Sequence, residues 1–197
     1  MAVAIGDLDN NGRADIVVAN SQSNTFTLLL NQGDGTLGGG GPHDSTGEYP
    51  AGIAIADVDG NGNRDVVVAN RSGGTLSVFR GNGNGSFAAP VQYPAGSQPW
   101  RVLPADLDGD GRMDFVVANG PVGGSGFFVL LQQPGGAFAS AVHYALGCGD
   151  PALALSVRGA ITTAGVRHYQ TWYRNAAPFC TPSGFNLTNG LSVLWAP

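Results

Sequence analysis

The sequence predicts an all-β protein, a partial β-propeller of about three four-stranded blades followed by a small C-terminal β-module. The main observation is an acidic nine-residue segment that occurs three times, at 7–15, 57–65 and 106–114. Its copies begin 50 and then 49 residues apart (7 to 57, 57 to 106), and internal repeats of this length are typical of propeller blades and stacked arrays. The 32 Gly, the 12 Pro and the 12% of charged residues favour short strands and tight turns over long helices.

Each repeat contains four predicted strands. A short apolar piece precedes the acidic segment, and an apolar strand ending in "AN" follows it at 16–20, 66–70 and 115–119. A third strand, such as "FTLLLN" or "LSVFRG", leads into a Gly-rich turn, and a fourth strand ends near a tyrosine. The strands ending in "AN" are continuously apolar, which predicts that stacked sheets cover both of their faces. Four-stranded units of this length, repeated around an axis, are propeller blades.

The three repeats are expected to span about 1–52, 53–101 and 102–145. Leu37 and Tyr49 are 12 residues apart, whereas the corresponding Phe87 and Tyr93 are six residues apart. The first repeat therefore carries an insertion near "GGGGPHDS", which we expect to lie in an outer hairpin.

The charge distribution excludes several classes of protein. All nine basic residues are Arg and none forms a run, so a nucleic-acid-binding surface is not predicted. No apolar run approaches the ~18 residues of a membrane-spanning helix, and no signal peptide is visible at the N-terminus. Ten of the 14 acidic residues lie in the three repeated segments, and removing those ten would change the net charge from −5 to +5. The acidity is therefore local.

The repeated segment has the chemistry of a calcium loop. Its pattern is Asp, x, Asp, x, Asp or Asn, Gly, x, x, Asp, and Gly at position 6 permits the sharp turn that lets side-chain oxygens at positions 1, 3, 5 and 9 converge. An all-oxygen set without His or Cys suits Ca²⁺. The pattern is not an EF-hand, since position 12 is Val18, Val68 or Val117 where an EF-hand needs Glu. Turn chemistry alone explains one or two such residues, but not a pattern that occurs three times.

We therefore predict about three Ca²⁺ ions, one for each loop, with position 7 offering its backbone carbonyl. The segment at 106–114 has four Asp residues, so it is expected to bind most tightly. The predicted ligands of the three loops are Asp7, Asp9, Asn11, Arg13 and Asp15; Asp57, Asp59, Asn61, Asn63 and Asp65; and Asp106, Asp108, Asp110, Arg112 and Asp114.

Residues 1–145 resemble the FG-GAP/VCBS repeats of integrin-α-type β-propellers, in which a D-x-D-x-D-G-x-x-D loop joins the first two strands of a blade. The resemblance implies that the loop residues above hold Ca²⁺, that the ion is structural, and that partners bind the faces of the ring. Two departures from the family matter. The "FG" and "GAP" landmarks are only partly present, as in "GSFAAP" at 85–90, and three copies do not close a propeller ring.

The C-terminal segment, 146–197, contains no acidic loop. Its end resembles a short β-module that closes many secreted bacterial proteins, and a degenerate fourth blade is the alternative. Cys148 and Cys180 favour a disulfide over a metal site.

These observations predict a calcium-binding extracellular or cell-surface scaffold for binding or adhesion, with a protein or glycan partner on a propeller face. The alternative is an accessory or truncated part of a secreted carbohydrate-active or other hydrolytic enzyme. No catalytic motif is found, so the chain is not predicted to be an enzyme. We expect His43 to be solvated, and His143 and His168 to lie on surface strands.

Overall fold

The structure is a computed structural model that describes residues 2–44, 47–120 and 126–145. The predictions for Cys148, for Cys180, for His168 and for the C-terminal β-module fall outside the described residues. Among the described residues there is no helix that is long and apolar enough to span a membrane.

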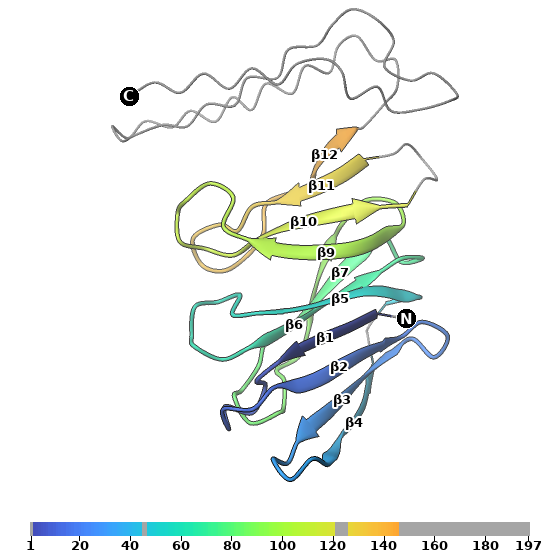
Figure 1. Cartoon of the computed structure of the whole chain (residues 1–197). Helices are drawn as coiled ribbons and strands as arrows, with labels where there is room; N and C mark the ends of the chain where they lie inside the picture. Colours follow the sequence, from blue (N-terminus) through green and yellow to red (C-terminus); the bar gives the residue numbers. More distant parts are fainter. Residues whose placement is uncertain (1, 45–46, 121–125, 146–197) are drawn as a thin grey trace, which may run out of the picture. The chain divides into compact units, whose positions relative to one another are not determined.

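Twelve strands form three four-stranded antiparallel sheets in the described part of the chain (Figure 1). Sheet 1 consists of β1 (Ala2–Gly6), β2 (Asp15–Asn20), β3 (Thr25–Asn31) and β4 (Leu37–Asp44). Sheet 2 consists of β5 (Pro50–Ala56), β6 (Asp65–Asn70), β7 (Thr75–Phe79) and β8 (Val91–Pro94). Sheet 3 consists of β9 (Pro99–Ala105), β10 (Asp114–Asn119), β11 (Gly126–Leu130) and β12 (Val142–Ala145). Each sheet is a simple meander, so the predicted all-β fold of three four-stranded blade-like units is confirmed.

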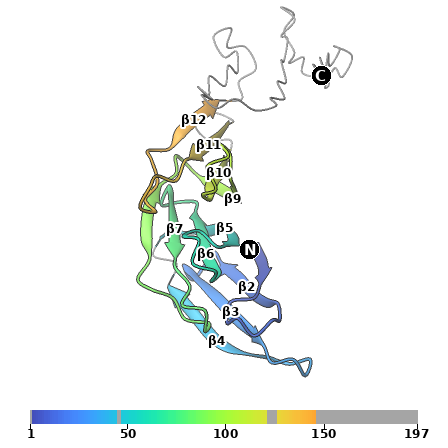
Figure 2. The ribbon, with the colours of Figure 1, turned by 90° about the vertical axis from the view of Figure 1, so that its left-hand side faces the viewer.

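The three sheets stack in sequence order, with the first strands β1, β5 and β9 next to one another (Figures 1 and 2). Two apolar cores lie between them. Val66 and Val68 of β6 join the core shared with sheet 1, whereas Val67 and Ala69 join the core shared with sheet 3. All six residues of β6 are buried. For this strand the prediction is confirmed, because neighbouring sheets cover both of its faces.

The outer sheets bury one face against their neighbour in the described part of the chain. On sheet 1, Val3 and Ile5 are 53% and 66% exposed on the face turned away from sheet 2. On sheet 3, Leu107 is 46% exposed, although Leu8 and Val58 at the same place in their loops are 1% exposed. The difference arises because sheets 2 and 3 cover Leu8 and Val58, respectively.

The first strands of sheets 2 and 3 approach each other closely. A Cβ at Gly52 would lie 2.7 Å from the backbone oxygen of Trp100 and 3.0 Å from the Cα of Arg101. Backbone cannot move aside as a flexible side chain can, so the contact requires glycine at position 52.

The insertion in the first repeat forms the outer strand itself. β4 pairs with β3 along its whole length, with a register shift between Leu28 and Leu29. The expectation that His43 is solvated is wrong, because its ring stacks on Phe26 at 4.9 Å and meets Phe87 edge-on at 5.4 Å. Tyr49 follows β4 in the link to β5, with a φ of 55°, whereas Tyr93 lies within the fourth strand of its sheet. His143 is exposed on β12, as expected.

Replacing Gly52 with alanine tests the close contact between sheets 2 and 3. We expect Gly52→Ala to lower the free energy of unfolding by about 1–3 kcal/mol, the usual cost of overpacking. Gly39→Ala is the matched control, because the nearest atom to its Cβ would be 3.9 Å away. Denaturant unfolding measures both variants, and an equal effect in the two would contradict the contact.

The half-buried ring of His43 predicts a pH dependence of stability. Burial lowers the pKa of His43 from its ordinary value, and a hydrogen bond with the backbone of Gly40 opposes the shift only in part. Protonation therefore favours the unfolded chain, so this contribution to stability is present above the ordinary pKa of about 6.5 and is lost as the pH falls below it. Stability curves at about pH 7.5 and 5.5 should show a smaller loss in His43→Phe than in the parent. Equal losses would contradict the assignment.

Candidate metal centres

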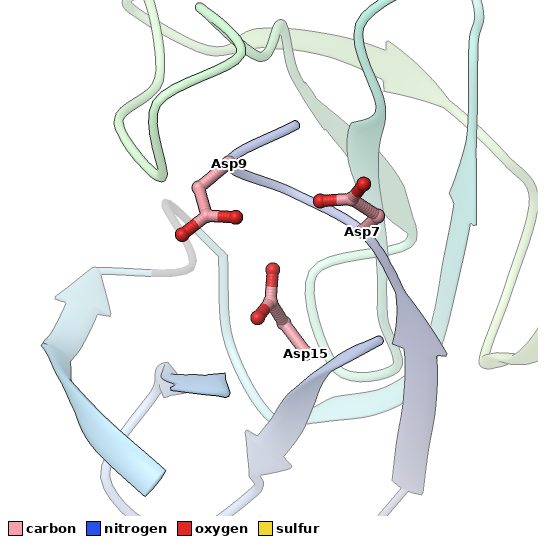
Figure 3. Close-up of side chains that lie close together, drawn as sticks. All are labelled: Asp7, Asp9 and Asp15. Carbon is pink, nitrogen blue, oxygen red and sulfur yellow. The ribbon is translucent and has the colours of Figure 1, made fainter. Parts of the chain in front are cut away.

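Each acidic segment forms the loop between the first two strands of a sheet. Within each loop, carboxylate oxygens at positions 1, 3 and 9 lie within 4.8 Å of one another. Figure 3 shows the first cluster, in which the three carboxylates face a common centre. The three clusters are Asp7, Asp9 and Asp15; Asp57, Asp59 and Asp65; and Asp106, Asp108 and Asp114.

The Asp at position 9 is fully buried and starts the second strand of its sheet. In the first loop, Asp15 accepts the backbone N–H of Leu8 through Oδ2 and that of Asn31 through Oδ1, both at 2.8 Å. It therefore ties the loop to the end of the third strand. The same two bonds recur at Asp65, from Val58 and Gly81, and at Asp114, from Leu107 and Gln132.

The remaining positions curl the loop by hydrogen bonds to its own backbone. Asp7 accepts the N–H groups of Asn11 at 3.2 Å and Gly12 at 2.8 Å, and Asn11 accepts that of Arg13 at 2.8 Å. The glycines at position 6 have φ values of 81°, 88° and 83°, a region in which a side chain would be strained. The loop geometry is thus set by the sequence pattern itself.

The side chains at position 5 of the loops contact position 7 of the same loop. In the third loop, Asp110 lies outside the cluster of three carboxylates and pairs instead with the guanidinium of Arg112. Asn11 and Asn61 turn their amide oxygens toward the N–H of position 7. The expected ligand role of the carbonyls of Arg13, Asn63 and Arg112 stays a prediction, as do the full ligand sets.

Sequence analysis did not identify Arg80, which lies beside the second loop. Its Nη1 is 3.3 Å from Asp59, and its Nη2 donates to the carbonyl of Gly136 in the next repeat at 3.0 Å. No sequence signal marks it, since the corresponding residues in the other repeats are Leu30 and Leu131. Within the described ranges, the ion pairs are those of Arg80 with Asp59 and of Arg112 with Asp110. The carboxylate cluster of the first loop therefore has no cationic partner among the described residues.

The crowding of carboxylates favours a bound cation. Burial raises the pKa of Asp65, the nearby charge of Asp59 adds to this effect, and the backbone bonds from Gly81 and Val58 oppose it. Desolvation also raises the pKa of Asp108, together with the negative charges of Asp110 and Asp114. A cation at the centre of a cluster would reverse these unfavourable interactions.

The donor set suits Ca²⁺. Every candidate ligand atom is an oxygen, and hard oxygen ligands are the ones that Ca²⁺ takes. Oxygens that bind one ion lie no farther apart than twice the metal–oxygen distance, which is about 2.3–2.6 Å for Ca²⁺. The 4.8 Å limit within each cluster fits this requirement.

Comparisons with known proteins identify the repeats. The family model of the FG-GAP-like repeat matches residues 7–68 and 57–117, and that of the FG-GAP repeat matches residues 99–143. Among curated proteins, none matches the chain. The family matches together extend over 7–143, well over half of the 197 residues, and include all three acidic loops. The chain belongs to the FG-GAP repeat family.

Proposed function

We propose that this chain is a calcium-binding extracellular scaffold, whose blade-like sheets present surfaces for a protein or glycan partner. One observation carries the calcium assignment: three carboxylates converge in each of three loops that share one backbone conformation. The first of these clusters has no cationic side chain as a partner among the described residues.

The proposed role of the ion is structural. Each loop joins the first strand of a sheet to the second, and its buried Asp also holds the third strand. An ion in the loop would offset the repulsion of the carboxylates and fix this corner of the sheet. An ion that binds only the folded chain stabilises it by mass action, by about 2.7 kcal/mol per site at one hundred times the dissociation constant.

The family and the chemistry of the loops support an extracellular setting. FG-GAP repeats are typical of extracellular proteins. Exposed loops on extracellular modules bind Ca²⁺ with dissociation constants of about 10⁻⁴ to 10⁻³ M, a range that only an extracellular calcium concentration would fill. A role as an accessory part of a hydrolytic enzyme stays the alternative from the sequence.

Calcium is expected to raise the midpoint of thermal unfolding. With ~10 mM Ca²⁺ and the affinities above, each loop would contribute about 1.4–2.7 kcal/mol. Differential scanning calorimetry with Ca²⁺, with Mg²⁺ and with EGTA measures the effect, and Mg²⁺ should give a smaller shift because it prefers a tighter octahedron. No shift at millimolar Ca²⁺ would refute the metal assignment.

Two substitutions in the first loop separate ion binding from the structural role of its buried Asp. Asp9→Asn should reduce the calcium-dependent shift by the share of one loop and leave the ion-free protein at least as stable, because a repelling charge is removed. Asp15→Asn should lower stability by about 1–3 kcal/mol with or without Ca²⁺, since Asp15 satisfies two backbone donors. If both variants changed the ion-free stability equally, this division of roles would be wrong.

A further inference from the structure

Three residues from separate segments meet at the end of the sheets opposite the acidic loops. Tyr49 lies just before β5, Arg71 follows β6, and Trp100 is the second residue of β9. The guanidinium carbon of Arg71 is 4.7 Å from the ring centroid of Trp100 and 5.6 Å from that of Tyr49. The three side chains form a cluster with an arginine between two aromatic rings, which we call the aromatic–arginine cluster.

The repeat architecture does not require these side chains. Counted from the first Asp of each loop, Arg71 corresponds to Ser21, Trp100 to Ala51 and Tyr49 to Gln98. The backbone is nevertheless alike, since Tyr49 and Gln98 have φ values of 55° and 52°. Because the same backbone forms with other side chains, the cluster is an addition to the fold rather than a part of it.

The side chains of the cluster have unused binding capacity. Tyr49 and Trp100 are 39% and 51% exposed. Arg71 donates one long side-chain hydrogen bond, from Nη2 to Oε1 of Gln98 at 3.4 Å, and its buried Nε has no hydrogen-bond partner. No carboxylate in the described residues forms an ion pair with it. A guanidinium between two exposed rings is thus available to an anionic group of a ligand.

A hollow lies beside Tyr49. Its volume is about 600 Å³, a size suited to a small ligand. Five of the six residues that line it carry a hydroxyl or side-chain amide group. The lining residues are Ala19, Asn20, Ser21, Gln22, Ser23 and Tyr49. The donor groups of Asn20 and Ser21 are engaged within the protein, but their oxygens can still accept hydrogen bonds from the hydroxyl groups of a ligand.

We propose that the aromatic–arginine cluster and the adjoining hollow bind an acidic saccharide. The apolar C–H face of a sugar ring would lie on the exposed ring of Trp100 or Tyr49, its carboxylate would pair with Arg71, and its hydroxyl groups would bond in the hollow. Trp, Tyr and Arg also dominate protein interfaces, but a hollow of small-ligand size, lined by residues that bear hydroxyl and amide groups, favours a saccharide. The proposal gives a ligand class to the scaffold function proposed above, and it does not depend on the bound calcium.

The test is a titration of the full chain in the presence of Ca²⁺. The two ligands compared are a glucuronate-containing tetrasaccharide and the methyl ester of the same tetrasaccharide. We expect the acid form to bind on the order of tenfold or more tightly than the ester, and to weaken with added salt. Trp100→Ala and Arg71→Gln should each reduce affinity for the acid form by a similar factor. Trp100→Phe keeps an aromatic face and should retain most of the binding.

Matched controls are available on the same strand as Trp100. Leu103→Ala removes an exposed apolar side chain, and Arg101→Gln removes an exposed positive charge; neither should change the affinity. The calcium-dependent shift of the unfolding midpoint, measured on every variant, shows that each is folded. If the parent protein showed no calcium-dependent shift, calcium binding would be refuted, and the result of the saccharide titration would be unaffected.

Several outcomes would overturn the proposal. They are no binding of the acid form at millimolar concentration, equal binding of acid and ester, and unchanged affinity in Trp100→Ala or Arg71→Gln. Capture of a protein partner through the cluster, without competition from the saccharide, would also overturn it.

Discussion

Each sheet depends on one buried carboxylate at the start of its second strand. A buried charge must be satisfied by hydrogen bonds, and Asp15 meets this requirement with one N–H group from the loop before it and one from the third strand. The chain between β1 and β2 must therefore curl back on itself, which requires the glycine at position 6. The same curl brings the carboxylates of Asp7 and Asp9 to Asp15, so the loop that ties the sheet together also forms a cluster that could hold a cation.

The contacts between sheets follow from the residues of the first strands. Gly52 admits the backbone of β9 at a distance that no side chain would allow. The corresponding residue of sheet 3 is Arg101, and Leu103 there corresponds to Ala54. Ala54 is 9% exposed, whereas Leu103 is 54% exposed. The small residues Gly52 and Ala54 of sheet 2 let sheet 3 pack closely on sheet 2. The outer face of sheet 3 has the large side chains of Arg101 and Leu103 at the corresponding positions.

Features that repeat with the period could be predicted, and features that differ between repeats could not. The loops and the four strands of each unit could be predicted from the sequence, because they depend on local turn chemistry and on the pattern of apolar residues. The partial burial of His43 depends on contacts of its ring with Phe26 and Phe87, residues distant in sequence. Arg80 and Arg71 replace residues of other types in the sister repeats, so their partners become visible only when the sheets are assembled. The side chain at position 5 also differs between the loops, because Asp110 pairs with Arg112 in the third loop.

The proposed calcium ion in each acidic loop is tested by counting the ions that the chain binds. Equilibrium dialysis of the chain against labelled Ca²⁺ gives the number of ions bound at saturation. We expect three ions, falling to two in Asp9→Asn with the other two sites unchanged. Saturation at fewer than three ions, or an unchanged count in Asp9→Asn, would contradict it.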